Sequence, residues 1–141
     1  MPHLHALPLL LLLALSAAHA EMVVAVRADS EIGPLNKTEL THIFLGRYRQ
    51  LASGQQAEPL DLPVASPEHA AFYEALLNKT SAEIRAYWAR LVFTGRVAPP
   101  RTVDNSERLQ EQLLANPRAL GYLERTKLDR RLRVVFEFGE R

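Results

Sequence analysis

The residues best suited to do chemistry lie where an expected strand leads into an expected helix. Ser66 sits at this step, and the start of a helix presents free backbone N–H groups and the positive end of the helix dipole. Ser30 follows the first expected strand and could face Ser66 if the two strands are neighbours. Thr94, Gly95 and Arg96 could supply further donors. Together these residues predict a site for a small oxyanion.

Two neighbours of Ser66 oppose the binding of an anion. Pro67 has no N–H donor, and Glu68 places a carboxylate in the first turn of the helix. Ser66 also suits a simpler role as an N-cap, because its hydroxyl can accept a hydrogen bond from a first-turn amide. The capping preferences of serine favour this simpler role, and both interpretations stay open at this point.

The sequence carries no signature of catalysis or of metal binding. After residue 20 it contains the histidines His42 and His69, and the whole chain lacks cysteine. No side chain is spaced to complete a metal site with either histidine, and both are expected on helix surfaces. No nucleophile elbow, Walker loop or dinucleotide-binding glycine motif occurs. We therefore predict a protein that is not an enzyme, with no catalytic residue, metal or cofactor; a hydrolase is the weakest alternative.

Residues 1–20 have the pattern of a secretory signal peptide. An apolar run over residues 7–18 precedes the small-residue sequence Ala18-His19-Ala20, and the run is short for a transmembrane helix. Lys and Arg are missing from the start of the chain, and an uncleaved anchor is the alternative. Cleavage after Ala20 would leave residues 21–141 as one periplasmic domain without stable membrane insertion. The net charge of +1 argues against a dedicated nucleic-acid-binding protein.

The order of the expected elements predicts an α/β fold. Strands are expected at 22–27, 59–64, 119–123 and 132–138, and helices lie between them. The first strand is apolar throughout, as in buried parallel sheets, and 96–103 is expected to be an exposed loop. We predict a single three-layer α/β domain with a small mixed sheet. The strand at 132–138 should lie at or near a sheet edge, where it could pair with a second copy of the chain.

A pair of helices over residues 66–95 organises the expected core. Ser66 and Pro67 suit the start of the first helix, and Thr80 and Glu83 have the spacing of a capping box for the second. The second helix carries an apolar stripe that includes the one tryptophan of the chain, Trp88. We therefore expect a compact core to form around this pair.

Four segments together resemble a family of short secreted bacterial proteins, the phosphate ABC transporter substrate-binding-like proteins. The segments are ELTHIFLGR (39–47), DLPVASPEHAAFY (61–73), AYWARLVFTG (86–95) and NPRALGYL (116–123). They are also similar to parts of the larger phosphate-binding proteins of the type II periplasmic fold. The resemblance implies one lobe of that fold, which binds phosphate or another small oxyanion and delivers it to an ABC transporter permease.

The sequence also departs from the family pattern. The larger proteins hold phosphate with an arginine and a Ser-Gly-Thr turn after the second strand, whereas residues 63–68 here read PVASPE and keep Ser66 alone. The larger proteins also close two lobes over the anion, and this chain has room for about one domain. An alternative is therefore an interaction module of the bacterial envelope, which has the same fold, binds no ligand and docks onto another envelope protein.

Overall fold

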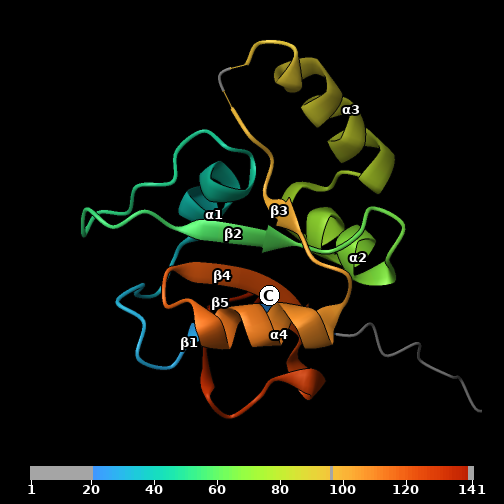
Figure 1. The fold of residues 1–141 in the computed structure, drawn as a ribbon. Helices are drawn as coiled ribbons and strands as arrows, with labels where there is room; N and C mark the ends of the chain where they lie inside the picture. Colours follow the sequence, from blue (N-terminus) through green and yellow to red (C-terminus); the bar gives the residue numbers. More distant parts are fainter. Residues whose placement is uncertain (1–20, 96, 140–141) are drawn as a thin grey trace, which may run out of the picture.

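The computed structural model describes residues 21–95 and 97–139, so the predicted signal peptide and Arg96 lie outside the described residues. The strands are β1 (Met22–Arg27), β2 (Glu58–Asp61), β3 (Arg101–Thr102), β4 (Ala119–Glu124) and β5 (Leu132–Glu137). The helices are α1 (Lys37–Phe44), α2 (Pro67–Leu77), α3 (Ser81–Val92), α4 (Ser106–Ala115) and the short 3₁₀ helix η1 (Arg125–Lys127). Strands and helices alternate along much of the chain, as predicted for an α/β fold (Figure 1).

The strands form a mixed sheet in the order β3-β2-β4-β1-β5. β2 runs parallel to both β3 and β4, whereas β1 runs antiparallel to its neighbours β4 and β5. β1 is buried as predicted, but the expectation of a parallel setting for it is wrong. Its continuous apolar sequence reflects burial on both faces, which does not depend on the direction of the neighbouring strands.

Helices cover both faces of the sheet, which confirms the predicted three layers. Gly121 and Tyr122 are neighbours on β4, so they face opposite sides of the sheet. A Cβ at Gly121 would meet Leu109 of α4 at 2.8 Å, whereas the ring of Tyr122 stacks on Phe72 of α2 with centroids 3.9 Å apart. α4 therefore covers one face and α2 the other (Figure 1).

The core is centred on β1 and β4, with α2 and α4 packed against them. Side chains of β1 from Val23 to Val26 are fully buried, and Phe72 and Tyr73 of α2 are buried as well. In α3, Ile84 and Trp88 are buried, but the far end of its apolar stripe is exposed. The expectation that the core forms around this pair is therefore confirmed, although α2 is buried more fully than α3. α3 packs on α2 and stands at the edge of the molecule (Figure 1).

The capping box predicted at Thr80 and Glu83 is present, and some of the predicted bounds differ. Asn36–Glu39 and Thr80–Glu83 both form capping boxes. The N-cap of α4 is Asn105, whose side chain accepts the Arg108 amide hydrogen at 2.9 Å. The loop expected at 96–103 contains the short edge strand β3, and the second strand ends at Asp61 rather than residue 64. β5 lies at a sheet edge as predicted. In the part of the chain that the structure describes, no helix is long and apolar enough to cross a membrane.

Candidate functional site

The turn between β2 and α2 is built around Ser66. β2 ends at Asp61, and Ser66 caps α2 by accepting a hydrogen bond from the His69 amide at 3.2 Å. The Ser66 hydroxyl in turn donates to the Pro63 carbonyl at 2.7 Å. Both hydrogen-bonding roles of this hydroxyl are therefore filled within the chain. The interpretation of Ser66 as an N-cap is confirmed, and its contact with an anion stays a prediction.

The first turn of α2 has few donors to offer an anion. Pro67 occupies the first helical position, and the Ala70 amide bonds to the Ser66 carbonyl at 3.4 Å. The Glu68 amide is left without an acceptor among the described residues. The Glu68 carboxylate lies 3.9 Å from the ammonium group of Lys127, which follows β4 in the short helix η1. Sequence reasoning missed Lys127, because only the fold brings it to the start of α2.

A buried carboxylate lies directly beneath this turn. Asp61 is 6% exposed, and its two oxygens accept hydrogen bonds from three donors. Tyr73 donates to one oxygen at 2.7 Å, and Tyr122 and the Leu62 amide donate to the other, the amide at 2.9 Å. Three donors and no acceptor suit an ionised carboxylate. We call Asp61, Tyr73, Tyr122 and the Leu62 amide the Asp61 cluster.

Burial shifts the pKa values of this cluster in consistent directions. Desolvation raises the pKa of Asp61, although the two tyrosine hydroxyls and nearby His69 oppose the shift. Desolvation together with the Asp61 charge raises the pKa values of Tyr73 and Tyr122 above their usual range. Both phenols therefore stay protonated and act as donors at neutral pH.

His69 joins α2 to α3 beside the Asp61 cluster. The residue is 1% exposed, so the prediction of a surface histidine is wrong for it. Its Nδ1 lies 2.7 Å from the Ser81 hydroxyl in the first turn of α3, and its Nε2 lies 4.0 Å from an Asp61 oxygen. Burial lowers the pKa of His69, and the Asp61 carboxylate partly opposes that shift. The Thr80 cap that turns α3 back over α2 brings Ser81 to the ring.

The aspartate, histidine and serine resemble the members of a hydrolase triad, but their geometry points to a structural role. In the working triad, the base takes the nucleophile's proton at one nitrogen and donates to the carboxylate from the other. Here the Asp61 oxygens are already used by tyrosines, and the His69 ring is sealed from solvent. The set holds α2, α3 and the end of β2 together beneath the turn.

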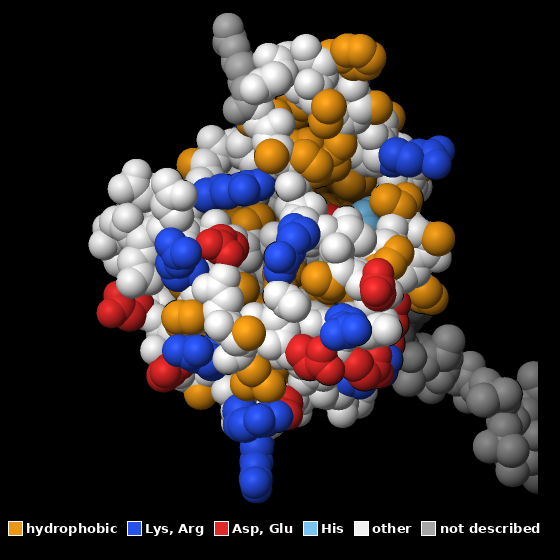
Figure 2. Space-filling view, in the orientation of Figure 1, with side chains coloured by type: hydrophobic (Ala, Val, Ile, Leu, Met, Phe, Trp, Pro, Cys, Tyr) orange, Lys and Arg blue, Asp and Glu red, His pale blue; other side chains and the backbone are white. Residues whose placement is uncertain are grey.

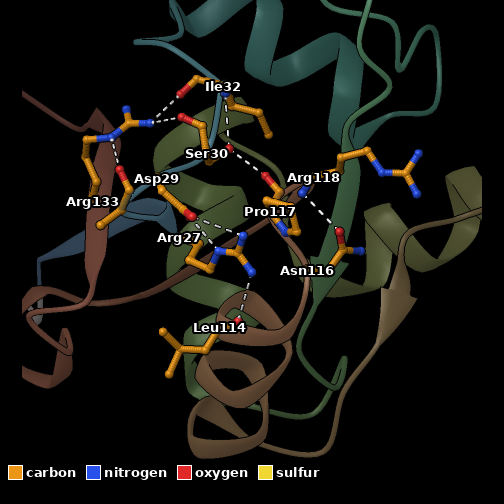
Figure 3. Close-up of polar contacts among 10 residues, drawn as sticks. Arg27, Asp29, Ser30, Ile32, Leu114, Asn116, Pro117, Arg118 and Arg133 are labelled. Carbon is orange, nitrogen blue, oxygen red and sulfur yellow. Dashed lines mark hydrogen bonds and ion pairs between the residues drawn. The ribbon is translucent and has the colours of Figure 1, made fainter.

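Ser30 anchors a different part of the molecule. Its hydroxyl donates to the Pro117 carbonyl at 2.5 Å and accepts the Ile32 amide hydrogen at 3.1 Å (Figure 3). The Arg133 guanidinium donates to the carbonyls of Ser30 and Ile32 at 2.7 and 2.9 Å. Ser30 therefore ties the loop after β1 to the start of β4 and to β5, and its hydroxyl both donates and accepts within the chain.

The sheet topology separates Ser30 from Ser66. β1 and β2 are not neighbours, because β4 lies between them. β1 is antiparallel to β4 and β2 is parallel to it, so β1 and β2 run in opposite directions. The loop after β1 and the turn after β2 therefore lie beyond opposite ends of the strands. Ser30 was expected to face Ser66 only if β1 and β2 were neighbours, and they are not.

The structure also separates Thr94 and Gly95 from Ser66. Both follow α3, whose 12 residues lead away from the contact between Ser81 and His69. A helix of that length spans about 18 Å. The Thr94 hydroxyl donates to the Leu91 carbonyl at 2.7 Å, and the Gly95 amide to the Val92 carbonyl at 3.2 Å. Of the predicted anion residues within the described chain, Ser66 is the one that lies at the β2–α2 turn.

A separate hollow of about 500 Å³ lies between α1 and the far end of α2. Lys37, His42 and Arg47 line it on the α1 side, and Glu74 lines it on the α2 side. His42 is partly buried and stacks on Tyr48 with ring centroids 5.0 Å apart. None of the predicted anion residues that the structure describes lines this hollow, so we treat it as separate from the predicted site.

Comparisons with known proteins define the class of fold. No model of a known protein family matches the chain, and no curated protein does. The chain is similar to the crystal structure of an ABC-type phosphate transport receptor from Vibrio cholerae, with a TM-score of 0.63 and 13% identity, over 82% of this chain and 45% of that chain. It is also similar to a putative phosphate ABC transporter substrate-binding protein with bound phosphate from Clostridium perfringens, with a TM-score of 0.64 and 14% identity, over 82% of this chain and 44% of that one.

The chain thus has the fold of part of a phosphate ABC transporter substrate-binding protein, and it spans less than half the length of either solved chain. The mixed sheet, covered by helices on both faces, is the architecture predicted for one lobe of a periplasmic binding protein. The resemblance is therefore confirmed at the level of the fold.

Proposed function

We propose that this protein is a periplasmic phosphate- or oxyanion-binding-like protein that works with ABC-type phosphate uptake, and that it acts by binding rather than by catalysis. The observation that carries the proposal is the fold. It is shared over 82% of the chain with two solved proteins of phosphate ABC transport, one of them with phosphate bound.

The proposed contact point is the β2–α2 turn. The Ser66 hydroxyl would rotate from the Pro63 carbonyl towards the anion, and the Glu68 amide would donate beside it. The Lys127 ammonium group would turn from the Glu68 carboxylate to the anion and would supply positive charge there. The dipole of α2 favours an anion at the same place. Delivery to a permease of an ABC transporter is part of this proposal.

Thermal unfolding of the secreted protein tests the binding step. The melting temperature is measured with phosphate, sulfate and chloride at matched ionic strength. Ligand that binds the folded state stabilises it by about 2.7 kcal/mol at a hundredfold excess over its dissociation constant. A rise that is selective for phosphate or sulfate supports the proposal, whereas equal curves in all three salts contradict it.

Two cap variants show whether the anion contacts Ser66. Ser66→Ala and Thr80→Ala each remove an N-cap, from α2 and from α3, so each should lower stability by about 1 kcal/mol. Ser66→Ala should also abolish the phosphate-dependent rise in melting temperature, and Thr80→Ala should keep it. A rise that survives in Ser66→Ala would place the anion elsewhere.

The periplasmic location is tested separately. We propose that residues 1–20 direct secretion and that cleavage follows Ala20. Cell fractionation of a bacterial host, followed by intact mass measurement, should find the chain in the periplasm with Glu21 at its N-terminus. Full-length protein in the cytoplasm or membrane fraction would contradict this part of the proposal.

A second candidate function is an envelope interaction module that binds no anion. The specific observation in its favour is that the hydroxyls of Ser30 and Ser66 already donate to carbonyls of the same chain. A well-folded secreted protein whose melting temperature does not respond to any oxyanion would favour this second function over the first.

A further inference from the structure

The end of α3 combines exposed apolar side chains with unopposed positive charge. Phe93 is 93% exposed and Val92 is 55% exposed, at the point where the helix ends. Residues 84–103 contain four arginines and no acidic residue. Two of these arginines, Arg85 and Arg90, are exposed on α3. We call Arg85, Arg90, Val92 and Phe93 the α3 tip.

The shape of the molecule presents this tip outwards. α3 buries Ile84 and Trp88 against the body and stands at one end of the molecule (Figure 1). Hydrophobic side chains gather at this end on the visible face, with basic side chains nearby (Figure 2). Among the residues that the structure describes, neither Arg85 nor Arg90 has an ion-pair partner. Their charge is therefore available to a binding partner.

The size of the apolar surface argues against a protein partner as the primary occupant. A stable protein interface needs about 800 Å² on each side, whereas an aromatic side chain buries about 150–250 Å². The apolar surface of two side chains at a protruding helix end is small beside the apolar core of such an interface. They are sufficient for shallow insertion into a bilayer, where apolar side chains enter the headgroup boundary and nearby arginines contact anionic lipid.

We propose that the α3 tip docks onto the surface of a membrane that contains anionic phospholipid. Phe93 and Val92 enter the interface between headgroups and acyl chains, and Arg85 and Arg90 lie against the phosphate groups. The attachment is peripheral and reversible, because one insertion point with two charges gives weak binding. It would hold the described domain at the bilayer, independently of whether the β2–α2 turn binds an oxyanion.

Vesicle co-sedimentation of the secreted protein tests the proposal. The probes are vesicles of phosphatidylglycerol mixed with phosphatidylcholine, and vesicles of phosphatidylcholine alone. We expect binding to the anionic vesicles, which weakens as salt shortens the Debye length below about 10 Å, and little binding to the neutral ones. Equal binding to both vesicles, or no binding to either at low salt, would overturn the proposal.

Variants locate the contact on the molecule. Phe93→Ser should lower the partition coefficient of the protein between solution and anionic vesicles about tenfold or more, because it removes the largest inserted side chain. Val64→Ser, which removes another exposed apolar side chain in the β2–α2 turn, should leave it unchanged. Arg85→Gln/Arg90→Gln should lower binding to anionic vesicles about tenfold, and Arg108→Gln/Arg130→Gln, with the same change in net charge, should not. Equal losses in the tip and control variants would overturn the proposed contact.

A fluorescent side chain gives an independent readout. Trp88 is the one tryptophan and is 9% exposed, so its emission should change little when the protein meets a vesicle. Phe93→Trp places a second indole at the tip and should add a blue shift with anionic vesicles and quenching by brominated acyl chains. Binding without these changes would show that the tip does not enter the bilayer. If the tip instead binds a partner protein, the secreted chain should co-sediment only with vesicles into which that protein has been reconstituted.

Discussion

At the scale of single residues, the polar interior beneath the β2–α2 turn is the least expected feature. Asp61 lies at the end of a strand that reads as apolar, and its donors come from α2 and β4, far apart in sequence. A local pattern can predict that Ser66 caps α2, because the cap uses an amide three residues away. It cannot predict Tyr122 or Lys127 at the same place, because the fold alone brings them there.

Tyr73→Phe should cost more stability than Tyr87→Phe. The Tyr73 hydroxyl donates to the Asp61 carboxylate at 2.7 Å, whereas the Tyr87 hydroxyl donates to the neutral Leu45 carbonyl at 2.8 Å. Hydrogen bonds to charged groups contribute about 1.5–3 kcal/mol and neutral ones about 0.5–1.5 kcal/mol. Chemical denaturation at neutral pH measures both losses. Similar losses would show that the Asp61 carboxylate does not strengthen its bond to Tyr73.

The stability of the protein should fall as the pH drops below about 6.5, because burial lowers the pKa of His69 in the folded state from its usual value of 6.5. The unfolded chain then binds a proton that the folded chain resists, so the free energy of unfolding declines with acidification. The raised pKa of Asp61 acts in the opposite direction, at pH values between its usual 3.8 and its raised value in the folded protein.

Denaturation curves between pH 7.5 and about 5.5 check this expectation, in the range where histidine titrates. His69→Gln should be less stable at neutral pH but should show a smaller loss on acidification. An unchanged slope in His69→Gln would assign the pH dependence to another group.

At the scale of helices and strands, local rules predicted which residues cap the helices, whereas tertiary packing decided how far each helix is buried. The capping boxes at Asn36 and Thr80 need nothing beyond residues three apart, and the structure contains both. The apolar stripe of α3 joins the core through Ile84 and Trp88, as expected, but its far end at Val92 is exposed. Amphipathic spacing shows that a helix has an apolar face but not how much surface is available to cover it.

Gly46→Ala should destabilise the protein more than Gly95→Ala. Both glycines have positive φ, 72° and 65°, so alanine carries a similar backbone penalty of about 1–2 kcal/mol at each. A Cβ at Gly46 would also lie 2.8 Å from the Trp88 ring, whereas nothing lies within 4 Å at Gly95. The Trp88 ring must then move away from the end of α1, which loosens α3.

Overpacking of this kind costs about 1–3 kcal/mol beyond the backbone term. Thermal and chemical unfolding of the two variants, together with Trp88 fluorescence, measure the difference. Equal losses in Gly46→Ala and Gly95→Ala would mean that the packing of Trp88 on Gly46 contributes nothing to the attachment of α3.

At the scale of the whole molecule, strand order decides which predicted residues can meet. The sequence predicts strands and their buried faces, but it does not show that β4 lies between β1 and β2 or that β1 is antiparallel. These two facts separate Ser30 from Ser66, and they depend on contacts between residues about a hundred positions apart, such as the bond from Arg133 to Ser30.

The described domain should be a monomer in solution. β5 lies at the sheet edge where pairing with a second copy was predicted, but its register shifts at a bulge opposite Val24 and Ala25. The Val135 carbonyl also accepts the Leu35 amide hydrogen at 2.9 Å. Bulges and covering loops disfavour edge-to-edge pairing. Light scattering over a range of concentrations checks this, and a dimer that Val135→Pro disrupts would support edge pairing instead.

The most direct test of the proposed function is a phosphate titration of the secreted protein followed by amide chemical shifts. We predict saturable shifts at the β2–α2 turn, centred on Ser66, Glu68 and His69, with smaller shifts near Lys127. Ser66→Ala should remove the saturable behaviour. Shifts that never saturate at millimolar phosphate, or that centre on the hollow lined by Lys37 and Arg47, would contradict an oxyanion site at this turn.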